Sequence, residues 1–205
     1  MASSRLNITP LSSMRVSKHQ IPAHQRIPNT SIQHKPLLHY HAAFPPTKDT
    51  TASAIESHLR SVGVVEPQWR YTMYSTTHFH STTHELLCIS QGGARLCFGG
   101  EDNPGRVEAE VCKGDVILVP AGVGHRLLEE VGEEGFEMVG SYPKGCSWDM
   151  CYGKEGRRPR SRGSNDWGGS RRILSTARKG RRWMSDRALK GYNADCAWQT
   201  TNRND

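Results

Sequence analysis

The sequence has few apolar residues, few aromatic residues and no long apolar run. Apolar residues make up 35% of the 205 positions, and aromatic residues make up 7%. No stretch of 18 or more apolar residues is present, so we expect no membrane-spanning helix. The frequent glycines and prolines, 20 and 11 in number, favour a loop-rich β protein over a helical bundle. A chain of this length has room for one domain and some additional sequence.

The six cysteines form no Cys-x-x-Cys pair, and no secretory signal precedes them. Reduced thiols that pack as small apolar residues are therefore expected, which indicates a cytoplasmic protein. Residues 1–48 contain basic residues and serines but no Asp or Glu, a composition typical of mitochondrial presequences. Prolines at positions 10, 22 and 28 would break the helix of such a presequence, so cytoplasmic location is the stronger expectation.

The formal net charge of +7 belongs to the last quarter of the chain. Residues 154–205 contain 14 Lys and Arg against 5 Asp and Glu, whereas residues 1–153 contain 13 against 15. The basic segment is rich in Arg, Gly and Ser, a composition that does not bury enough apolar area to fold. We therefore expect residues 154–205 to be a disordered tail, or non-native sequence introduced by an incorrect gene model. RNA binding through this tail is a more distant alternative.

The first third of the chain contains little regular structure. Residues 1–35 show no apolar periodicity, so we expect an extended or partly disordered leader. A first strand is predicted over Leu37–Phe44, and a single short helix over Ser53–Val62. Ser53, the first residue of this helix, and Glu56 form a capping-box pattern. Gly63 suits the position after the end of the helix.

Short β segments separated by turn residues follow from residue 64 onward. Their regular spacing predicts a mainly β domain over residues 36–153, built as a sandwich or barrel, of which a jelly roll is one arrangement. The predicted strands are Trp69–Tyr74, Thr76–His80, His84–Ser90, Ala94–Phe98, Val107–Val111, Asp115–Pro120, His125–Glu129 and Phe136–Tyr142.

Two of these segments contain residue types that bind metals. His78 and His80 are two residues apart in a predicted strand, so both imidazoles point to the same face. Glu85 follows after four residues, whose Ser-Thr-Thr start permits the next strand to fold back beside the first. A carboxylate then faces the imidazole pair. His125 follows a buried strand and a tight turn in the segment that begins at Gly114.

These residues resemble the two motifs of the cupin superfamily. The first motif has His-x-His, three or four residues, Glu, six residues and Gly; the second has Gly, five residues, Pro-x-Gly, two residues and His. The matching residues are His78, His80, Glu85 and Gly92 for the first motif, and Gly114, Pro120, Gly122 and His125 for the second. Thr72 and Glu129 stand where cupins usually have Gly and Asn, but neither is a ligand position.

The segments HFHSTTHELL, GDVILVPAGVGH and SYPKGCSWDM further resemble the small YjlB-type cupins of bacteria and fungi, over roughly residues 20–153. This resemblance implies a single-domain cupin double-stranded β-helix, an RmlC-like jelly-roll barrel, with one short N-terminal helix. It also implies a metal site formed by His78, His80, Glu85 and His125.

Three neutral imidazoles and one carboxylate form a mostly nitrogen shell with a net charge of −1. Such a shell suits one divalent transition metal, with Fe, Mn, Ni, Co, Cu and Zn all open. Four protein ligands on an octahedral ion would leave two neighbouring positions for water, O₂ or a chelating substrate. His84 should point to the opposite face of the strand from Glu85, so we expect it to support the ligands from outside their shell or to lie at the surface.

Further residues are candidates for the wall of a pocket beside the metal, although none is predicted as a general base. An arginine there would bind a substrate carboxylate or phosphate, and a tyrosine would assist proton transfer. The candidates, two of them found by counting every second residue back from His78, are Tyr74, Thr76, Gln68, Arg70, Tyr142 and Trp148. His39 and His41 form another pair two residues apart, which we interpret as one polar face of an early strand because the sequence offers them no carboxylate partner.

The sequence therefore favours a metal-dependent enzyme on a small organic substrate, with dioxygenase or oxidase, decarboxylase and isomerase reactions all open. A non-catalytic cupin that binds or senses a small molecule is the alternative. The expected partner is a small-molecule substrate or ligand, with a homodimer also open. A membrane is not expected as a partner, and nucleic acid is disfavoured.

Overall fold

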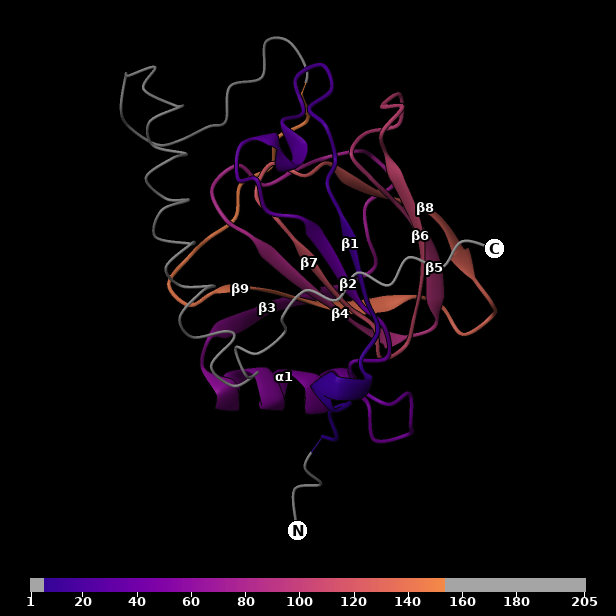
Figure 1. Ribbon diagram of the computed structural model, residues 1–205. Helices are drawn as coiled ribbons and strands as arrows, with labels where there is room; N and C mark the ends of the chain where they lie inside the picture. Colours follow the sequence, from indigo (N-terminus) through magenta and orange to yellow (C-terminus); the bar gives the residue numbers. More distant parts are fainter. Residues whose placement is uncertain (1–5, 154–205) are drawn as a thin grey trace.

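The computed structural model describes residues 6–153, and within them two antiparallel sheets face each other (Figure 1). One sheet has six strands in the order β1-β2-β7-β4-β9-β3, and the other has three in the order β6-β5-β8. The strands are β1 (Val16–His19), β2 (Leu37–Tyr40), β3 (Val65–Tyr71), β4 (Glu85–Gln91), β5 (Gly93–Phe98), β6 (Val107–Cys112), β7 (Val116–Val119), β8 (His125–Val131) and β9 (Glu137–Pro143). The described residues also contain one α-helix, α1 (Ala52–Val62), and two short 3₁₀ helices, η1 (Leu11–Ser13) and η2 (Asn29–Ser31). The predicted mainly β jelly roll with one short helix is confirmed.

Alternate residues of the six-stranded sheet pack into two separate apolar clusters. Leu87 and Ile117 lie in the cluster between the sheets, together with Leu96 of β5. Cys88, next to Leu87 in the chain, lies in the other cluster, where Ile55 of α1 covers the outer face of the sheet. This arrangement follows because successive side chains of a strand point to opposite faces. The inner cluster forms the floor on which the candidate site lies.

The helix begins and ends close to its predicted bounds, but its N-terminal cap differs. Thr51 is the cap residue, and its hydroxyl accepts a hydrogen bond of 3.2 Å from the backbone N–H of Ala54. The predicted cap residue, Ser53, lies inside the first turn and instead accepts a hydrogen bond from Arg70 of β3. The end is as predicted, because Gly63 adopts a left-handed conformation with φ of 70°.

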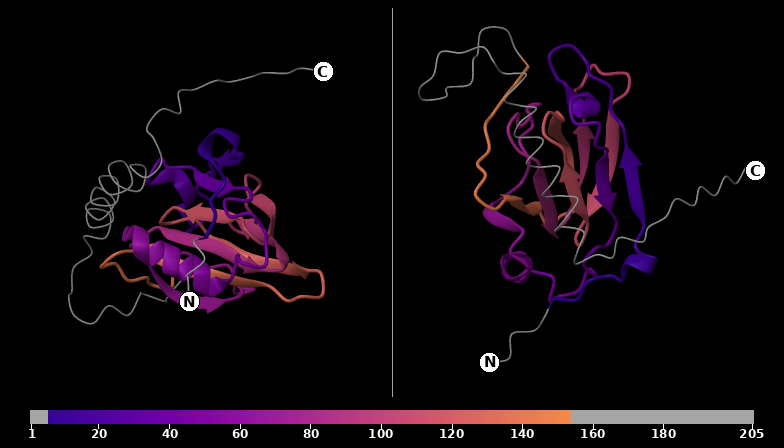
Figure 2. Two further views of the ribbon diagram at one scale, coloured as in Figure 1. Left: turned by 90° about the horizontal axis from the view of Figure 1, so that it is seen from below. Right: turned by 60° about the vertical axis from the view of Figure 1, so that its left-hand side comes forward.

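The N-terminal part of the chain belongs to the barrel, whereas residue 36 was the predicted beginning. β1 pairs with β2 at the edge of the six-stranded sheet, where Figures 1 and 2 show the indigo segment against later strands. Asn29 is fully buried, and its side chain bonds the backbone of Pro22, Gly99 and Gly124. Hydrogen bonds of Asn29 and the burial of single apolar residues such as Ile21 hold this region, and neither produces an apolar period in the sequence. The predicted tail, 154–205, lies outside the described residues.

One predicted strand is not a regular strand. Within Thr76–His80, His78 and Phe79 form only isolated bridges, to His125 and Cys151 respectively. This stretch is therefore irregular backbone, held by one bridge to the start of β8 and one to the segment after β9. No helix among residues 6–153 is both long enough and apolar enough to span a membrane.

Candidate metal centre

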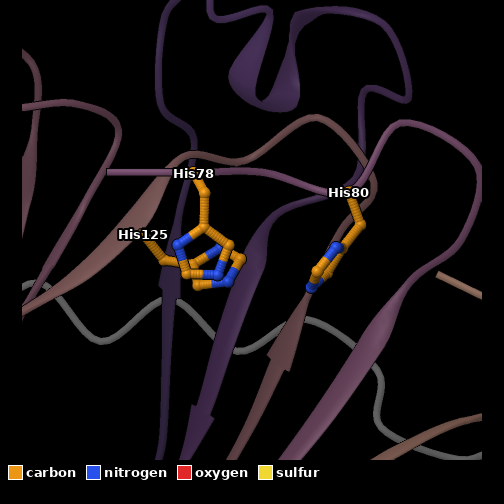
Figure 3. Close-up of side chains that lie close together, drawn as sticks. All are labelled: His78, His80 and His125. Atoms are coloured by element: carbon orange, nitrogen blue, oxygen red, sulfur yellow. The ribbon is translucent and has the colours of Figure 1, made fainter. Parts of the chain in front are cut away.

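Three histidines converge at one end of the barrel. His78 and His125 exchange backbone hydrogen bonds of 3.2 and 2.8 Å. This pairing joins the irregular segment that contains His78 to the start of β8. The carbonyl of His80 accepts a hydrogen bond of 2.8 Å from the N–H of Gly122. All three imidazoles are buried, and their ligand nitrogens lie within 4.8 Å of one another. Figure 3 shows His78 beside His125 and His80 across from them.

Glu85, the first residue of β4, lies between two of these imidazoles. Its Oε1 is 3.3 Å from Nε2 of His80, and its Oε2 is 3.4 Å from Nε2 of His125. The residue is only 2% exposed, yet among the described residues Oε2 has no hydrogen-bond partner. A buried carboxylate oxygen without a partner is unfavourable, and a cation at this position would remove that penalty. The structure thus brings together the four residues that the motifs predict as ligands.

Each imidazole is oriented through its Nδ1 atom by a backbone carbonyl. The partners are the carbonyls of Thr76 for His78 at 3.0 Å, Val123 for His125 at 3.0 Å, and Asp149 for His80 at 2.5 Å. Because a carbonyl only accepts hydrogen bonds, each Nδ1 must hold the proton. In the neutral imidazole, Nε2 then presents its lone pair to the centre of the group. Metal-binding histidines are held in this tautomer by the same kind of contact.

The charges of the group follow from burial and from the neighbouring side chains. Burial lowers the pKa of His125 to about 3 and lowers that of His78, so both are neutral at pH 7. Burial also disfavours the charged form of His80, but the hydrogen bond and charge of Glu85 outweigh it and raise the pKa. For Glu85, the neighbouring histidines and Tyr142 overcome burial and lower the pKa to about 2. The group therefore combines imidazole nitrogens with one ionised carboxylate, a donor set that fits a divalent transition metal.

His84 lies apart from the convergent nitrogens. Its Nδ1 accepts a hydrogen bond of 2.9 Å from the backbone N–H of Ala121, and burial lowers its pKa to about 4. This contact anchors the turn that leads to His125. A supporting position outside the ligand group is what strand alternation predicts for this residue.

Tyr142 and Trp69 form a hydrogen-bonded chain behind Glu85. The hydroxyl of Tyr142 donates to Oε1 of Glu85 and accepts a hydrogen bond of 3.0 Å from Nε1 of Trp69. The indole of Trp69 lies over Gly140 of β9, where a Cβ atom would come within 1.9 Å of the ring. Tyr142 was a predicted pocket residue, whereas Trp69 was missed. The signal that could have revealed Trp69 is Gly140, because a glycine inside a strand marks the close approach of a neighbouring group.

The segment after β9 closes one side of the group, and the contacts of its residues 149–151 were also missed. Besides its carbonyl contact with His80, Asp149 accepts hydrogen bonds of 2.7 and 2.5 Å from the backbone N–H and the hydroxyl of Ser81. Phe79 and Cys151 pair through two backbone hydrogen bonds of 2.8 and 3.0 Å. No spacing in the sequence relates residues 149–151 to the histidines, so only the fold reveals this contact.

A cavity of about 260 Å³ opens beside the four residues. Of the predicted pocket residues, Tyr74, Arg70, Tyr142 and Trp148 line it. Thr76 and Gln68 do not: the first offers its carbonyl to His78, and the second donates to the carbonyl of Cys146. Of the two residues found by counting back from His78, Tyr74 lines the cavity and Thr76 does not, because residues 72–77 are not a regular strand.

His39 and His41 do have a carboxylate partner, contrary to the sequence interpretation. Oδ2 of Asp115 lies 2.9 Å from Nε2 of His39, and the three side chains form a second group with metal-ligand atom types. Here, however, the polar atoms are already paired. Asp115 accepts hydrogen bonds from the backbone N–H of Ala42 and of Cys112, while His41 contacts Arg15 and Ser17. This group is a hydrogen-bond network that joins β1, β2 and the turn before β7.

Comparison with known proteins places the chain in a family. The Cupin family model matches residues 40–141. The uncharacterized protein YjlB of Bacillus subtilis (strain 168) is 36% identical over 90 residues, which cover 44% of this chain and 52% of YjlB. The chain thus spans about half the length of this curated relative.

Solved structures give weaker likenesses. A vicilin from Solanum melongena has a TM-score of 0.34 and 21% identity, covering 47% of this chain and 28% of the vicilin. An oxalate decarboxylase from Lactobacillus farciminis, solved as a formate complex, has a TM-score of 0.33 and 12% identity, covering 71% of this chain and 33% of that enzyme.

The region that matches the Cupin family model, 40–141, contains all four convergent residues and most strands of both sheets, and the chain belongs to the cupin superfamily.

Proposed function

We propose that this cupin holds one divalent transition metal ion and is an enzyme that acts on a small organic substrate. The ligands would be Nε2 of His78, His80 and His125 and the carboxylate of Glu85. One observation supports this most directly: three imidazoles, each fixed through Nδ1 by a carbonyl, bring one ring nitrogen each to within 4.8 Å of one another beside Glu85, whose buried Oε2 has no hydrogen-bond partner among the described residues. The adjoining cavity supports catalysis over a purely structural ion, because a small molecule could reach the site.

A bound ion would supply Lewis acidity, or redox chemistry with O₂, to a substrate in the cavity. The chain's own residues prepare the site for this. The carbonyls of Thr76, Val123 and Asp149 fix the imidazoles, and the hydroxyl of Tyr142 holds the Glu85 carboxylate in one orientation. Dioxygenase or oxidase, decarboxylase and isomerase reactions all remain compatible with this arrangement.

Elemental analysis of the full chain, purified without added metal, tests the ligand set. We expect nearly one equivalent of metal in the parent and a large loss in His80→Ala. His41→Ala is the matched control, because it makes the same change in the other histidine group and should retain the metal. Retention by His80→Ala, or loss only in His41→Ala, would contradict the proposal. Turnover of candidate substrates by the loaded protein, followed by O₂ consumption and product analysis, then separates an enzyme from a binding protein.

A further inference from the structure

Apart from the four proposed ligands, aromatic and sulfur-containing side chains dominate the cavity wall. The aromatic members are Trp69, Tyr71, Tyr74, Tyr142 and Trp148. Three methionines, Met73, Met138 and Met150, are also part of the wall. Aromatic rings attract one another in offset or edge-on arrangements, and thioether sulfurs make favourable contacts with ring edges. This wall is therefore suited to a flat apolar ring.

The one Lys or Arg side chain in the described part of the wall is already held in an ion pair outside the cavity. Arg70 is the one Lys or Arg among these lining residues. Its guanidinium is already engaged, with Nε 2.5 Å from Oε1 of Glu56 and Nη2 3.0 Å from Oγ of Ser53, both on α1. A second carboxylate of a small diacid would lose its hydration without gaining a partner, which is strongly unfavourable. The wall thus disfavours dicarboxylates.

Two of the hydroxyl groups that line the cavity already donate their protons elsewhere. Tyr142 donates to Glu85, and Thr72 donates to Oε1 of Glu130 at 3.2 Å. A sugar presents several hydroxyls that each need a partner when buried. The other two hydroxyls of the described wall belong to the half-exposed Tyr71 and Tyr74, so few buried side-chain partners remain for a sugar, and the wall also disfavours sugars.

The mouth of the cavity exposes aromatic surface to water. Tyr71, Tyr74 and Trp148 are 55%, 53% and 42% exposed, although large aromatic residues usually bury most of their surface. Tyr71 and Tyr74 lie together, with ring centroids 5.8 Å apart, and Trp148 stacks on Tyr142 at 6.3 Å with an interplanar angle of 24°. A ring-shaped ligand would cover part of this surface and thereby gain hydrophobic stabilisation.

We propose that the cavity binds a small monocyclic aromatic compound whose ring contacts Trp148 and whose oxygen substituents reach the metal centre. This substrate class rests on the proposed function above. The cavity of about 260 Å³ is larger than the roughly 150 Å³ sufficient for benzene, which leaves room for ring substituents.

Binding of catechol, oxalate and xylose to the Zn²⁺-loaded full chain tests the proposal without any reaction, because Zn²⁺ is redox-inert. Calorimetry measures affinity, and zinc analysis after dialysis checks that the ion stays bound. We expect catechol to bind at least tenfold more tightly than oxalate or xylose. Equal or tighter binding of oxalate or xylose would overturn the proposal.

Trp148→Ala should weaken catechol binding about tenfold, as expected for loss of one aromatic contact. Trp148→Phe should restore most of it. Val131→Ala is a matched control, because Val131 is likewise exposed, at 53%, but does not line the cavity. Unchanged catechol affinity in Trp148→Ala would overturn the proposed ring contact.

Failure of the metal site would be distinguishable from failure of the ring site. If the chain takes up no metal, the proposed function fails. Phenol binding to the metal-free protein, followed by tryptophan fluorescence, then tests the ring site alone. Saturable phenol binding that is lost in Trp148→Ala and kept in Val131→Ala would support the ring site, whereas its absence would refute it.

Discussion

Replacing Tyr142 with Phe removes one hydroxyl from the network around Glu85 and leaves the ring in place. That hydroxyl donates to the Glu85 carboxylate and accepts the Nε1–H of Trp69. A hydrogen bond to a charged group contributes about 1.5–3 kcal/mol, so the free energy of unfolding of the metal-free protein should fall by about this amount. At roughly 2–4 °C per kcal/mol for a chain of this size, the melting temperature should fall by about 3–12 °C.

A double-mutant cycle with Glu85→Gln separates this bond from the general packing of Tyr142. Because the Gln acceptor is neutral, Tyr142→Phe should lower the free energy of unfolding by only about 0.5–1.5 kcal/mol in that background. Urea unfolding measured with a chelator present avoids the extra stability that a bound ion would add. The reasoning is refuted if Tyr142→Phe has the same effect in both backgrounds to within about 0.3–0.5 kcal/mol, the limit expected for independent sites.

Two further substitutions test the support of the site and of the second histidine group. Gly140→Ala would place Cβ 1.9 Å from the Trp69 indole, so we expect a loss of about 1–3 kcal/mol in urea unfolding with altered tryptophan emission; parent-like stability and emission would contradict the close packing. Burial alone would raise the pKa of Asp115, but hydrogen bonds from His39, Ala42 and Cys112 lower it below its ordinary 3.8. A carboxyl with a lowered folded pKa stabilises the protein above its unfolded pKa, and this contribution is lost as pH falls through the folded value. The difference in free energy of unfolding between the parent and Asp115→Asn should therefore have its full value at about pH 6 and decrease below about pH 4. A difference that does not change with pH would contradict this assignment.

The predicted ligands converge in the structure, although the regular strand from which we predicted this is not present. His78 and His80 were placed on one face of a regular strand, yet they lie on irregular backbone with isolated bridges. What fixes His78 is its backbone exchange with His125, a pairing that two motifs far apart in sequence do not reveal. The motif match nevertheless predicts which residues meet, although the local conformation inferred from the spacing of His78 and His80 is wrong.

The contacts that orient the imidazoles are predictable only where they are local. His78 and His125 each bond the carbonyl two residues earlier, at Thr76 and Val123, so short-range geometry is sufficient for both. His80 bonds the carbonyl of Asp149, which is 69 residues away. A backbone carbonyl has no residue type that a motif could specify. Such a partner is known only once the path of the chain is known.

The two histidine groups illustrate why residue type alone does not define a metal site. Each has histidines two residues apart, and in each a buried carboxylate lies beside an imidazole. In the group of His39 and His41, Asp115 accepts hydrogen bonds on both carboxylate oxygens, and the guanidinium of Arg15 contacts His41, which disfavours a cation. In the group of His78, His80 and His125, Oε2 of Glu85 has no hydrogen-bond partner among the described residues. Because a buried polar atom is nearly always paired in a folded protein, the unpaired oxygen beside three imidazoles favours the Glu85 group as the proposed metal site, and the paired oxygens of Asp115 disfavour the other group.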